Sequence, residues 1–207
     1  MIVSAYQPYY APFSGFFSKA MRSDTLVLMD AVQFPRGTTW LTRNRFKNDQ
    51  GFYWMTVPVR KKGLGLQKIN EVHICHERRW ANKFLSSLKS AYAKAPFLES
   101  HLAFLEEVFS VKFERLIDLN VKIIRHLMES LLIPAKVVLL SELGIESREP
   151  QLSVEVCRKL DASHFLAQSG AKKYLYPQLW GPFIPNLSVF DLLFNCGPAA
   201  HEILKKG

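Results

Sequence analysis

The sequence predicts an α/β fold: an open, mostly parallel sheet with flanking helices and a helical insertion. Short apolar segments of strand length alternate with amphipathic helical patterns near both ends of the 207-residue chain, which is typical of strand–helix–strand units in a parallel sheet. A long stretch of helical periodicity separates the two ends. We therefore expect a single domain over residues 1–207, with a helical subdomain at about residues 79–132.

The first strand–helix–strand unit occupies the amino-terminal residues. Met1–Ala5 is an apolar strand, and Thr25–Met29 is rich in the apolar and β-branched residues that favour a second strand. Between them, apolar residues recur at helical spacing, and Pro12 suits the first position of a helix. The apolar residues of this helix are Phe13, Phe16, Phe17, Ala20 and Met21.

The segments that follow are assigned from their periodicity. Phe34–Asn48 is polar and irregular, and a loop of this length in a compact domain is often functional. Gly51–Val59 alternates as a strand does, and Ile69–Ile74 is a candidate short strand. The helical stretch comprises Trp80–Tyr92 and then Leu98–Leu132, which we expect to be two helices broken near Ser110.

The second strand–helix–strand unit follows Pro134, which stops the helical run. Its expected elements are a strand at Lys136–Leu140, a helix at Glu149–Leu160, a strand at His164–Ala167 and a final amphipathic helix at Leu187–Phe194.

The formal net charge of +9 favours an anionic partner. The basic residues are spread along the chain, and no nucleic-acid-binding signature is present. An anionic small molecule, a nucleic acid or an anionic membrane surface would fit this charge, and of these we expect a small anionic substrate and no nucleic acid. The three cysteines form no CxxC pair and the histidines lack the spacing of helical metal ligands, so we expect free thiols and no metal site of the protein's own.

No signal-peptide pattern and no long uncharged apolar stretch is visible, so we expect a cytoplasmic protein without a transmembrane segment. The oligomeric state is not predicted. The cofactor is also open, since a divalent metal could accompany a bound diphosphate.

Polar residues follow the predicted strands at their carboxyl ends, where an open α/β sheet places its ligand. They are Gln7, Asp30, Ser141-Glu142 and Ser169-Gly170. Gln7 and Tyr9 precede a helix amino terminus, which suits a phosphate, although a loop packed by prolines and tyrosines is equally expected. Asp30 could bind a sugar hydroxyl, hold a metal or act as a base, and its alternative is a turn carboxylate that bonds nearby N–H groups.

Arg43 and Arg45 follow the second strand closely and could bind a phosphate or carboxylate in bidentate fashion. Their alternative is a structural ion pair with Asp30. Trp40 either stacks on a base or sugar ring or packs in the core, and Asn186 either caps the final helix or helps to form a ligand site. The candidate catalytic residues are Asp30 and Gln7, and the candidate binding residues are Tyr9, Gln33, Trp40, Arg43, Asn44, Arg45, Ser169, Gly170, Asn186 and Ser188.

Motifs along nearly the whole chain point to one family. They include Gln7-Pro8-Tyr9, Asp30-x-Val32-Gln33-Phe34, Trp40-x-x-Arg43-Asn44-Arg45, Trp54-x-Thr56-Val57-Pro58-Val59, Tyr176-Pro177-Gln178 and Asn186-x-Ser188-x-x-Asp191. Their combination resembles the WbqC-like family, which occurs in bacterial gene clusters for surface polysaccharides, including the lipopolysaccharide O-antigen. The resemblance implies action on a nucleotide-linked or lipid-linked amino sugar, for example acyl or aminoacyl transfer.

The chain departs from the family pattern at three places. Tyr6 stands where many relatives have His, and Ala31 stands where many have a second carboxylate. Relatives also carry additional residues between the positions of Leu175 and Tyr176.

The family resemblance and the converging polar residues give, as the first hypothesis, a transferase that acts on an activated sugar. The alternative is a non-catalytic binding or scaffold protein of the same pathway, which these departures favour, and a third hypothesis, nucleic-acid binding, rests on the net charge alone.

Overall fold

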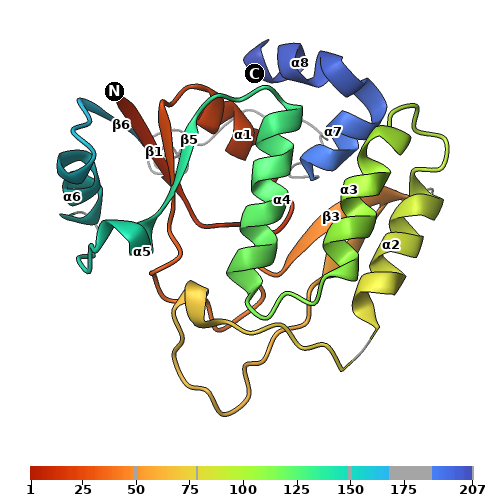
Figure 1. The fold of residues 1–207 in the computed structure, drawn as a ribbon, viewed down its shortest axis with the longest axis horizontal. Helices are drawn as coiled ribbons and strands as arrows, with labels where there is room; N and C mark the ends of the chain where they lie inside the picture. The colour runs from red at the N-terminus through yellow and green to blue at the C-terminus, as the bar shows by residue number, and fades with distance from the viewer. Residues whose placement is uncertain (49–50, 78, 149–150, 168–187, 207) are drawn as a thin grey trace.

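Within the described residues, four parallel strands form the central sheet, in the order β5-β2-β1-β6 (Figure 1). The computed structural model describes residues 1–48, 51–77, 79–148, 151–167 and 188–206. The strands are β1 (Ile2–Tyr6), β2 (Thr25–Leu28), β5 (Lys136–Leu139) and β6 (His164–Leu166). This parallel sheet with helices around it confirms the predicted fold class.

Helices cover both faces of the sheet, and for this reason the strands are almost continuously apolar. On one face, Leu26 and Leu28 of β2 share a core with Phe16 and Phe17. This larger core takes in α1 (Ser14–Met21), α4 (Leu116–Ser130), α7 (Val189–Cys196) and α8 (Ala200–Lys206). On the other face, a smaller core joins Val3, Ala5 and Val27 to α5 (Leu140–Leu143) and α6 (Gln151–Lys159).

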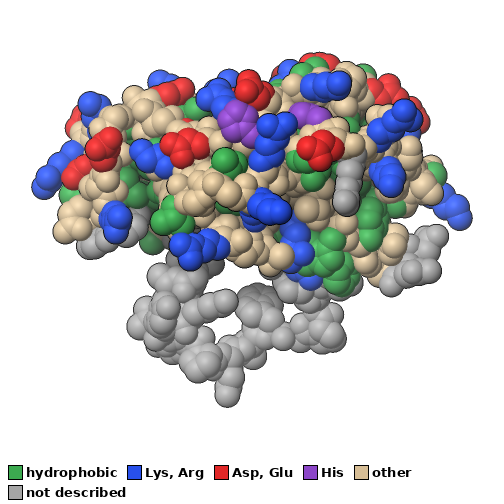
Figure 2. Space-filling model, turned by 90° about the horizontal axis from the view of Figure 1, so that it is seen from below, with side chains coloured by type: hydrophobic (Ala, Val, Ile, Leu, Met, Phe, Trp, Pro, Cys, Tyr) green, Lys and Arg blue, Asp and Glu red, His purple; other side chains and the backbone are tan. Residues whose placement is uncertain are grey.

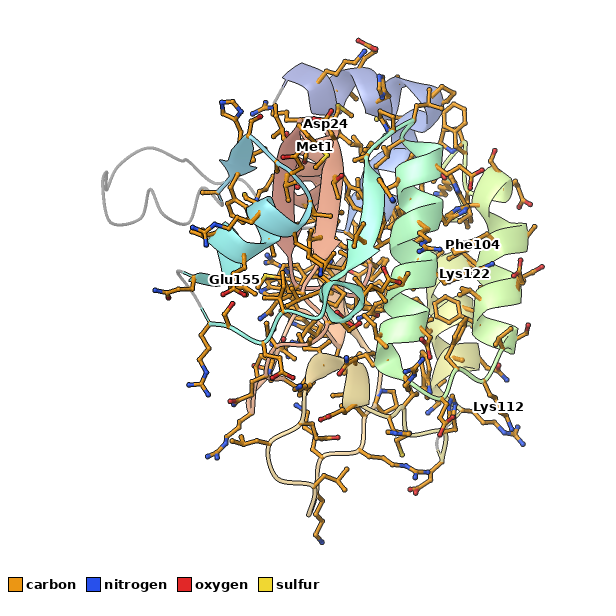
Figure 3. All side chains as sticks on the ribbon, turned by 60° about the vertical axis from the view of Figure 1, so that its left-hand side comes forward. Met1, Asp24, Phe104, Lys112, Lys122 and Glu155 are labelled. Atoms are coloured by element: carbon orange, nitrogen blue, oxygen red, sulfur yellow. The ribbon has the colours of Figure 1, made fainter. Side chains whose placement is uncertain are left out.

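The two ends of the sheet differ in character. At the amino end, the Ile2 N–H donates to the Asp24 carboxylate over 2.6 Å, and Figure 3 shows Met1 and Asp24 side by side. At the opposite, carboxyl end lie the loops that follow β1, β2 and β5, together with the short 3-10 helix η1 (Ile69–Glu71) (Figure 1). The candidate site residues that follow these strands are therefore on one side of the molecule.

Between β2 and β5, the described residues form an antiparallel hairpin, the 3-10 helix η1 and three α-helices. The hairpin consists of β3 (Arg43–Asn48) and β4 (Gly51–Thr56), with Arg45 opposite Trp54. The helices are α2 (Trp80–Ala91), α3 (Glu99–Ser110) and α4, so the predicted break near Ser110 is confirmed. Their apolar faces join the larger core.

Three expectations about local structure were wrong. The polar segment Phe34–Asn48 ends in strand β3, because Asn44 and Phe46 point into the core. The basic residues that alternate with them are half-buried or exposed: Arg43, Arg45 and Lys47. Ile69–Ile74 is not a strand, since Ile69–Glu71 forms a 3-10 turn in which Glu71 accepts from the Lys68 N–H, and only single bridges follow. The helix expected at Leu187–Phe194 runs from Val189 to Cys196 with Ser188 as its N-cap, and it is not the final helix, since α8 follows it.

Candidate functional site

The carboxyl ends of β1 and β2 are joined by a backbone hydrogen bond from Met29 to the Tyr6 carbonyl, 2.8 Å long. Asp30 follows directly, and its side chain is only 1% exposed. Ser141, just after β5, reaches the same carboxylate from the neighbouring strand. The predicted convergence of strand ends is thus present for β1, β2 and β5.

The Asp30 carboxylate is held by Ser141 and Asn70. One oxygen accepts the Ser141 backbone N–H over 2.9 Å, and the other accepts the Ser141 hydroxyl over 2.6 Å and the Asn70 amide over 3.3 Å. The Asp30 carbonyl also accepts the Asn70 N–H over 2.9 Å. These bonds correspond to the turn-carboxylate alternative, because they direct the carboxylate at its neighbours and tie the ends of β2, β5 and η1 together.

The loop after β1, residues 7–12, is fixed by two buried asparagines. Asn120 of α4 is fully buried and donates to the carbonyls of Pro8 and Leu41 over 2.8 and 2.9 Å. Asn44 of β3 donates to the Ala11 carbonyl over 2.6 Å. The loop and the hairpin are therefore one rigid unit at the carboxyl end of the sheet.

The outer surface of this unit combines arginines with aromatic rings, and we call it the Arg–Trp face (Trp40, Arg43, Arg45, Phe52 and Trp54). The Arg43 guanidinium lies 4.0 Å from the Trp54 ring centre. The Arg45 guanidinium lies 5.2 to 5.6 Å from the rings of Phe52, Trp40 and Trp54. Phe52 and Trp54 are 42% and 40% exposed, so both rings are open to solvent.

Cation–π stacking fixes a guanidinium through its flat face and leaves the N–H groups at its edge for other partners. Among the described residues, Arg43 has no carboxylate within ion-pair distance. The Arg–Trp face therefore offers a pre-oriented cation and exposed rings, which together can bind a phosphate and stack on a base or sugar.

The remaining predicted residues lie at different depths. Gln7 and Tyr9 are half-buried in the loop after β1, Tyr9 against Phe13 and Phe16, and Gln33 is exposed. Asn44 is buried, and its side-chain amide donates to the loop after β1 as described above. Ser188 is buried as the N-cap of α7, where its hydroxyl accepts from the Phe190 N–H, and its own N–H donates to the Arg45 carbonyl. Ser169, Gly170 and Asn186 lie outside the described residues.

Tyr6 and Ala31, two of the departures from the family pattern, both pack in or against a hydrophobic core. The Tyr6 ring stacks on Phe16 with centroids 4.8 Å apart, and it is buried. Ala31 packs half-buried beside the smaller core. Tyr6 thus fills part of the core at the end of β1, and Ala31 supplies no second carboxylate beside Asp30.

A buried amine lies beneath Tyr6. Lys19 of α1 is 8% exposed, its Nζ lies 4.5 Å from the Tyr6 ring centre, and it donates to the Ala5 carbonyl over 3.2 Å. Burial lowers the pKa of Lys19 to about 8. A group in this environment loses its proton much more readily than an ordinary lysine.

Two of these residues escaped the sequence analysis. Asn120 was missed, although a single Asn among the apolar positions of the helix 116–130 is a detectable signal. Lys19 was missed because a lysine on an amphipathic helix is normally solvated. As for metals, no group of three or more His, Cys, Asp or Glu side chains that could ligate an ion occurs in the part of the chain that the structure describes.

Comparison with known proteins gives the family. The model of the WbqC-like protein family matches residues 7–175 and 174–203, so the chain belongs to this family. The two matched segments overlap at residues 174–175, next to the position between Leu175 and Tyr176 where we expect relatives to carry additional residues.

Among curated proteins, the chain is 26% identical over 226 residues to the Uncharacterized protein Rv1507c of Mycobacterium tuberculosis (strain ATCC 25618 / H37Rv). That similarity covers 98% of this chain and 97% of the relative. No solved structure matches the chain.

Proposed function

We propose that the protein binds a sugar activated by a diphosphate, nucleotide-linked or lipid-linked, and transfers a group to it in surface-polysaccharide biosynthesis. The observation that carries this proposal is the Arg–Trp face, in which Arg43 stacks on Trp54 at 4.0 Å beside Arg45. The Arg43 guanidinium, held in this way, matches a phosphate in charge and geometry, and Arg45 adds a second positive charge beside it. Membership of the WbqC-like family agrees with such a substrate but does not name it.

The elements around the two arginines suit the base and the sugar of such a ligand. The exposed rings of Trp54 and Phe52 provide stacking surfaces for a base or a sugar. Gln7, in the loop that Asn120 and Asn44 hold against the hairpin, can donate and accept hydrogen bonds to sugar hydroxyls. In this arrangement the arginines also stabilise negative charge that develops on a departing phosphate.

We assign Asp30 a positioning role in this proposal. Its carboxylate already accepts three hydrogen bonds from Ser141 and Asn70, and it is almost fully buried. A general base needs an oxygen within reach of the substrate proton. Asp30 instead fixes the loops that surround the ligand.

The second candidate is a binding or scaffold protein without turnover. The buried, fully engaged Asp30 and the absence of a carboxylate at Ala31 favour it. Both candidates share the binding step and differ only in whether product forms.

A thermal-shift screen tests the binding step that both candidates share, and a turnover assay with the ligand it finds separates the two candidates. The folded protein is heated with nucleotide sugars, nucleoside diphosphates and divalent metals, and a ligand that binds only the native state raises the melting temperature. We expect a rise with at least one nucleotide sugar that is lost in Arg43→Ala. A ligand that binds but never turns over with acyl or aminoacyl donors would support the scaffold candidate. A rise that persists in Arg43→Ala would contradict the site.

A further inference from the structure

The loop between β4 and η1 carries exposed leucines among basic residues. Leu64 and Leu66 are 50% and 58% exposed, and they are among the most exposed large apolar side chains of the described residues. Basic residues flank them on both sides and are exposed as well: Arg60, Lys61, Lys62 and Lys68. Two open leucines inside such a cationic segment are unusual for a surface that faces only water.

The base of this loop is anchored. The Arg60 N–H donates to the His73 carbonyl over 3.0 Å, and the Phe34 N–H donates to the Gln67 carbonyl over 2.9 Å. Gln33 and Lys68 form a further bridge. The segment is therefore held at both of its ends, and residues 61–66 project beyond this base as a tip.

The tip is a tight turn. The Leu64 N–H donates to the Lys61 carbonyl over 3.3 Å, and Gly63 and Gly65 adopt positive φ angles of 80° and 64°. Glycine takes these left-handed conformations without strain. Figure 1 shows this loop as the lowest part of the molecule, and Figure 3 shows it on the side opposite Met1.

The charge around the tip is strongly positive. Lys61 is tied to the neighbouring loop, since its Nζ donates to the Gly37 carbonyl over 3.1 Å and lies 4.8 Å from the Phe34 ring centre. Arg36 is exposed on that same neighbouring loop. Figure 2, which views this side directly, shows Lys and Arg side chains spread over the whole face, with the Asp and Glu side chains mainly in its upper half.

We propose that the tip, residues 61–66, docks on an anionic membrane surface. The two leucines enter the headgroup boundary, and the flanking lysines and arginines lie against lipid phosphates, as in other peripheral attachments that combine apolar and basic residues. A nucleic acid would use the basic residues but would leave the leucines without a role. This inference does not depend on the proposed substrate.

Docking in this orientation has a functional consequence. The tip continues into η1, where Asn70 bonds Asp30 at the carboxyl end of the sheet. The carboxyl end of the sheet, where Asp30 lies, would thus face the membrane. The protein could then bind a lipid-linked sugar phosphate while the lipid stays in the bilayer.

The test is co-sedimentation of the full chain with vesicles of phosphatidylglycerol and phosphatidylcholine in equal parts, and with phosphatidylcholine alone. One variant removes the leucines (Leu64→Ser with Leu66→Ser), and another reverses charges (Arg60→Glu with Lys62→Glu). Ile203→Ser with Val154→Ser is the matched apolar control, since these side chains are 47% and 48% exposed on α8 and α6. Lys136→Glu with Lys159→Glu is the matched charge control, at exposed positions outside the tip.

We expect binding to the anionic vesicles that falls at least tenfold in each tip variant and less than threefold in each control. Thermal melts establish that every variant is folded. A folded wild-type protein that does not bind anionic vesicles would overturn the proposal. So would equal losses in tip and control variants, or binding to single-stranded DNA but not to vesicles. The nucleotide-sugar screen contains no lipid, so failure here is distinguishable from failure of the proposed function.

Discussion

Ser141 donates to both oxygens of the Asp30 carboxylate, through its backbone N–H over 2.9 Å and its hydroxyl over 2.6 Å. The two residues are 111 positions apart in the chain. Their contact joins the carboxyl ends of β2 and β5, two neighbouring strands of the sheet. The buried Asp30 carboxylate therefore holds the loops together at the carboxyl end of the sheet, where we place the ligand.

We expect Ser141→Ala to lower the free energy of unfolding by about 1.5–3 kcal/mol, because a hydrogen bond to a buried charged group is lost. Urea denaturation measures the change. Ser87→Ala, at an exposed position of α2, is the matched control and should stay within about 0.5 kcal/mol of wild type. Equal stability of the two variants would contradict the role of the Ser141 hydroxyl.

Asn120→Ala should cost about 2–4 kcal/mol of the free energy of unfolding. The substitution leaves the buried carbonyls of Pro8 and Leu41 without their donor and opens a cavity in the core. Hydrogen exchange should accelerate in residues 7–12, because this loop loses its anchor to α4. Unchanged exchange in the loop would show that Asn44 alone holds it.

The sheet was predictable because its strands are short, apolar and separated by clear helical patterns. The convergence of Asp30 with Ser141 followed from the rule that parallel strands end at one edge. Asn70 was not predictable as a partner of Asp30, because its position depends on the path of a long loop.

Strand β3 of the hairpin could not be predicted from the sequence for a related reason. Strand β3 buries one apolar residue, Phe46, and one asparagine, Asn44, so it lacks an alternating apolar pattern. Asn44 is buried because the carbonyls of Tyr10 and Ala11 accept its amide, and these carbonyls come from a segment distant in sequence. Tertiary contacts decided the structure here.

Stability should fall as the pH drops below about 6.5, because a buried histidine, His101, contacts a half-buried one, His126. His101 Nδ1 and His126 Nε2 lie 3.2 Å apart, and the His126 ring stacks on Phe104 at 3.6 Å. Burial, then His101 and Lys122, lower the pKa of His126 to about 4, against the opposing charge of Glu107, and burial also lowers the pKa of His101. Between about pH 6.5 and 4 the unfolded chain therefore binds protons that the folded chain excludes.

Denaturant unfolding at several pH values measures this effect. The shift of His126 corresponds to about 3 kcal/mol, which we reduce to about 2 kcal/mol because the ring is partly exposed. His126→Gln should flatten the dependence on pH, whereas His164→Gln, at an exposed position, should leave it unchanged. A slope that survives His126→Gln would point to other groups.

Lys19→Met should raise the free energy of unfolding by about 1 kcal/mol at pH 7. Methionine fills a similar volume and carries no charge to desolvate, although the bond to the Ala5 carbonyl is lost. The gain should shrink as the pH rises from about 8 towards 10.5, because folded Lys19 releases its proton first and the wild type is then stabilised. Thermal melts at pH 7 and pH 10 test both statements, and a variant less stable at pH 7 would refute them.

The most direct test of the account is calorimetric titration of the folded protein with a panel of nucleoside-diphosphate sugars, comparing wild type with Arg43→Ala, Arg43→Lys and the exposed control Arg158→Ala. We expect binding to at least one ligand, weakened tenfold or more by Arg43→Ala. Binding should also be weaker in Arg43→Lys, because an ammonium lacks the bidentate edge of a guanidinium, and unchanged in Arg158→Ala. Binding that is equal in Arg43→Ala and wild type would contradict the placement of the diphosphate on the Arg–Trp face.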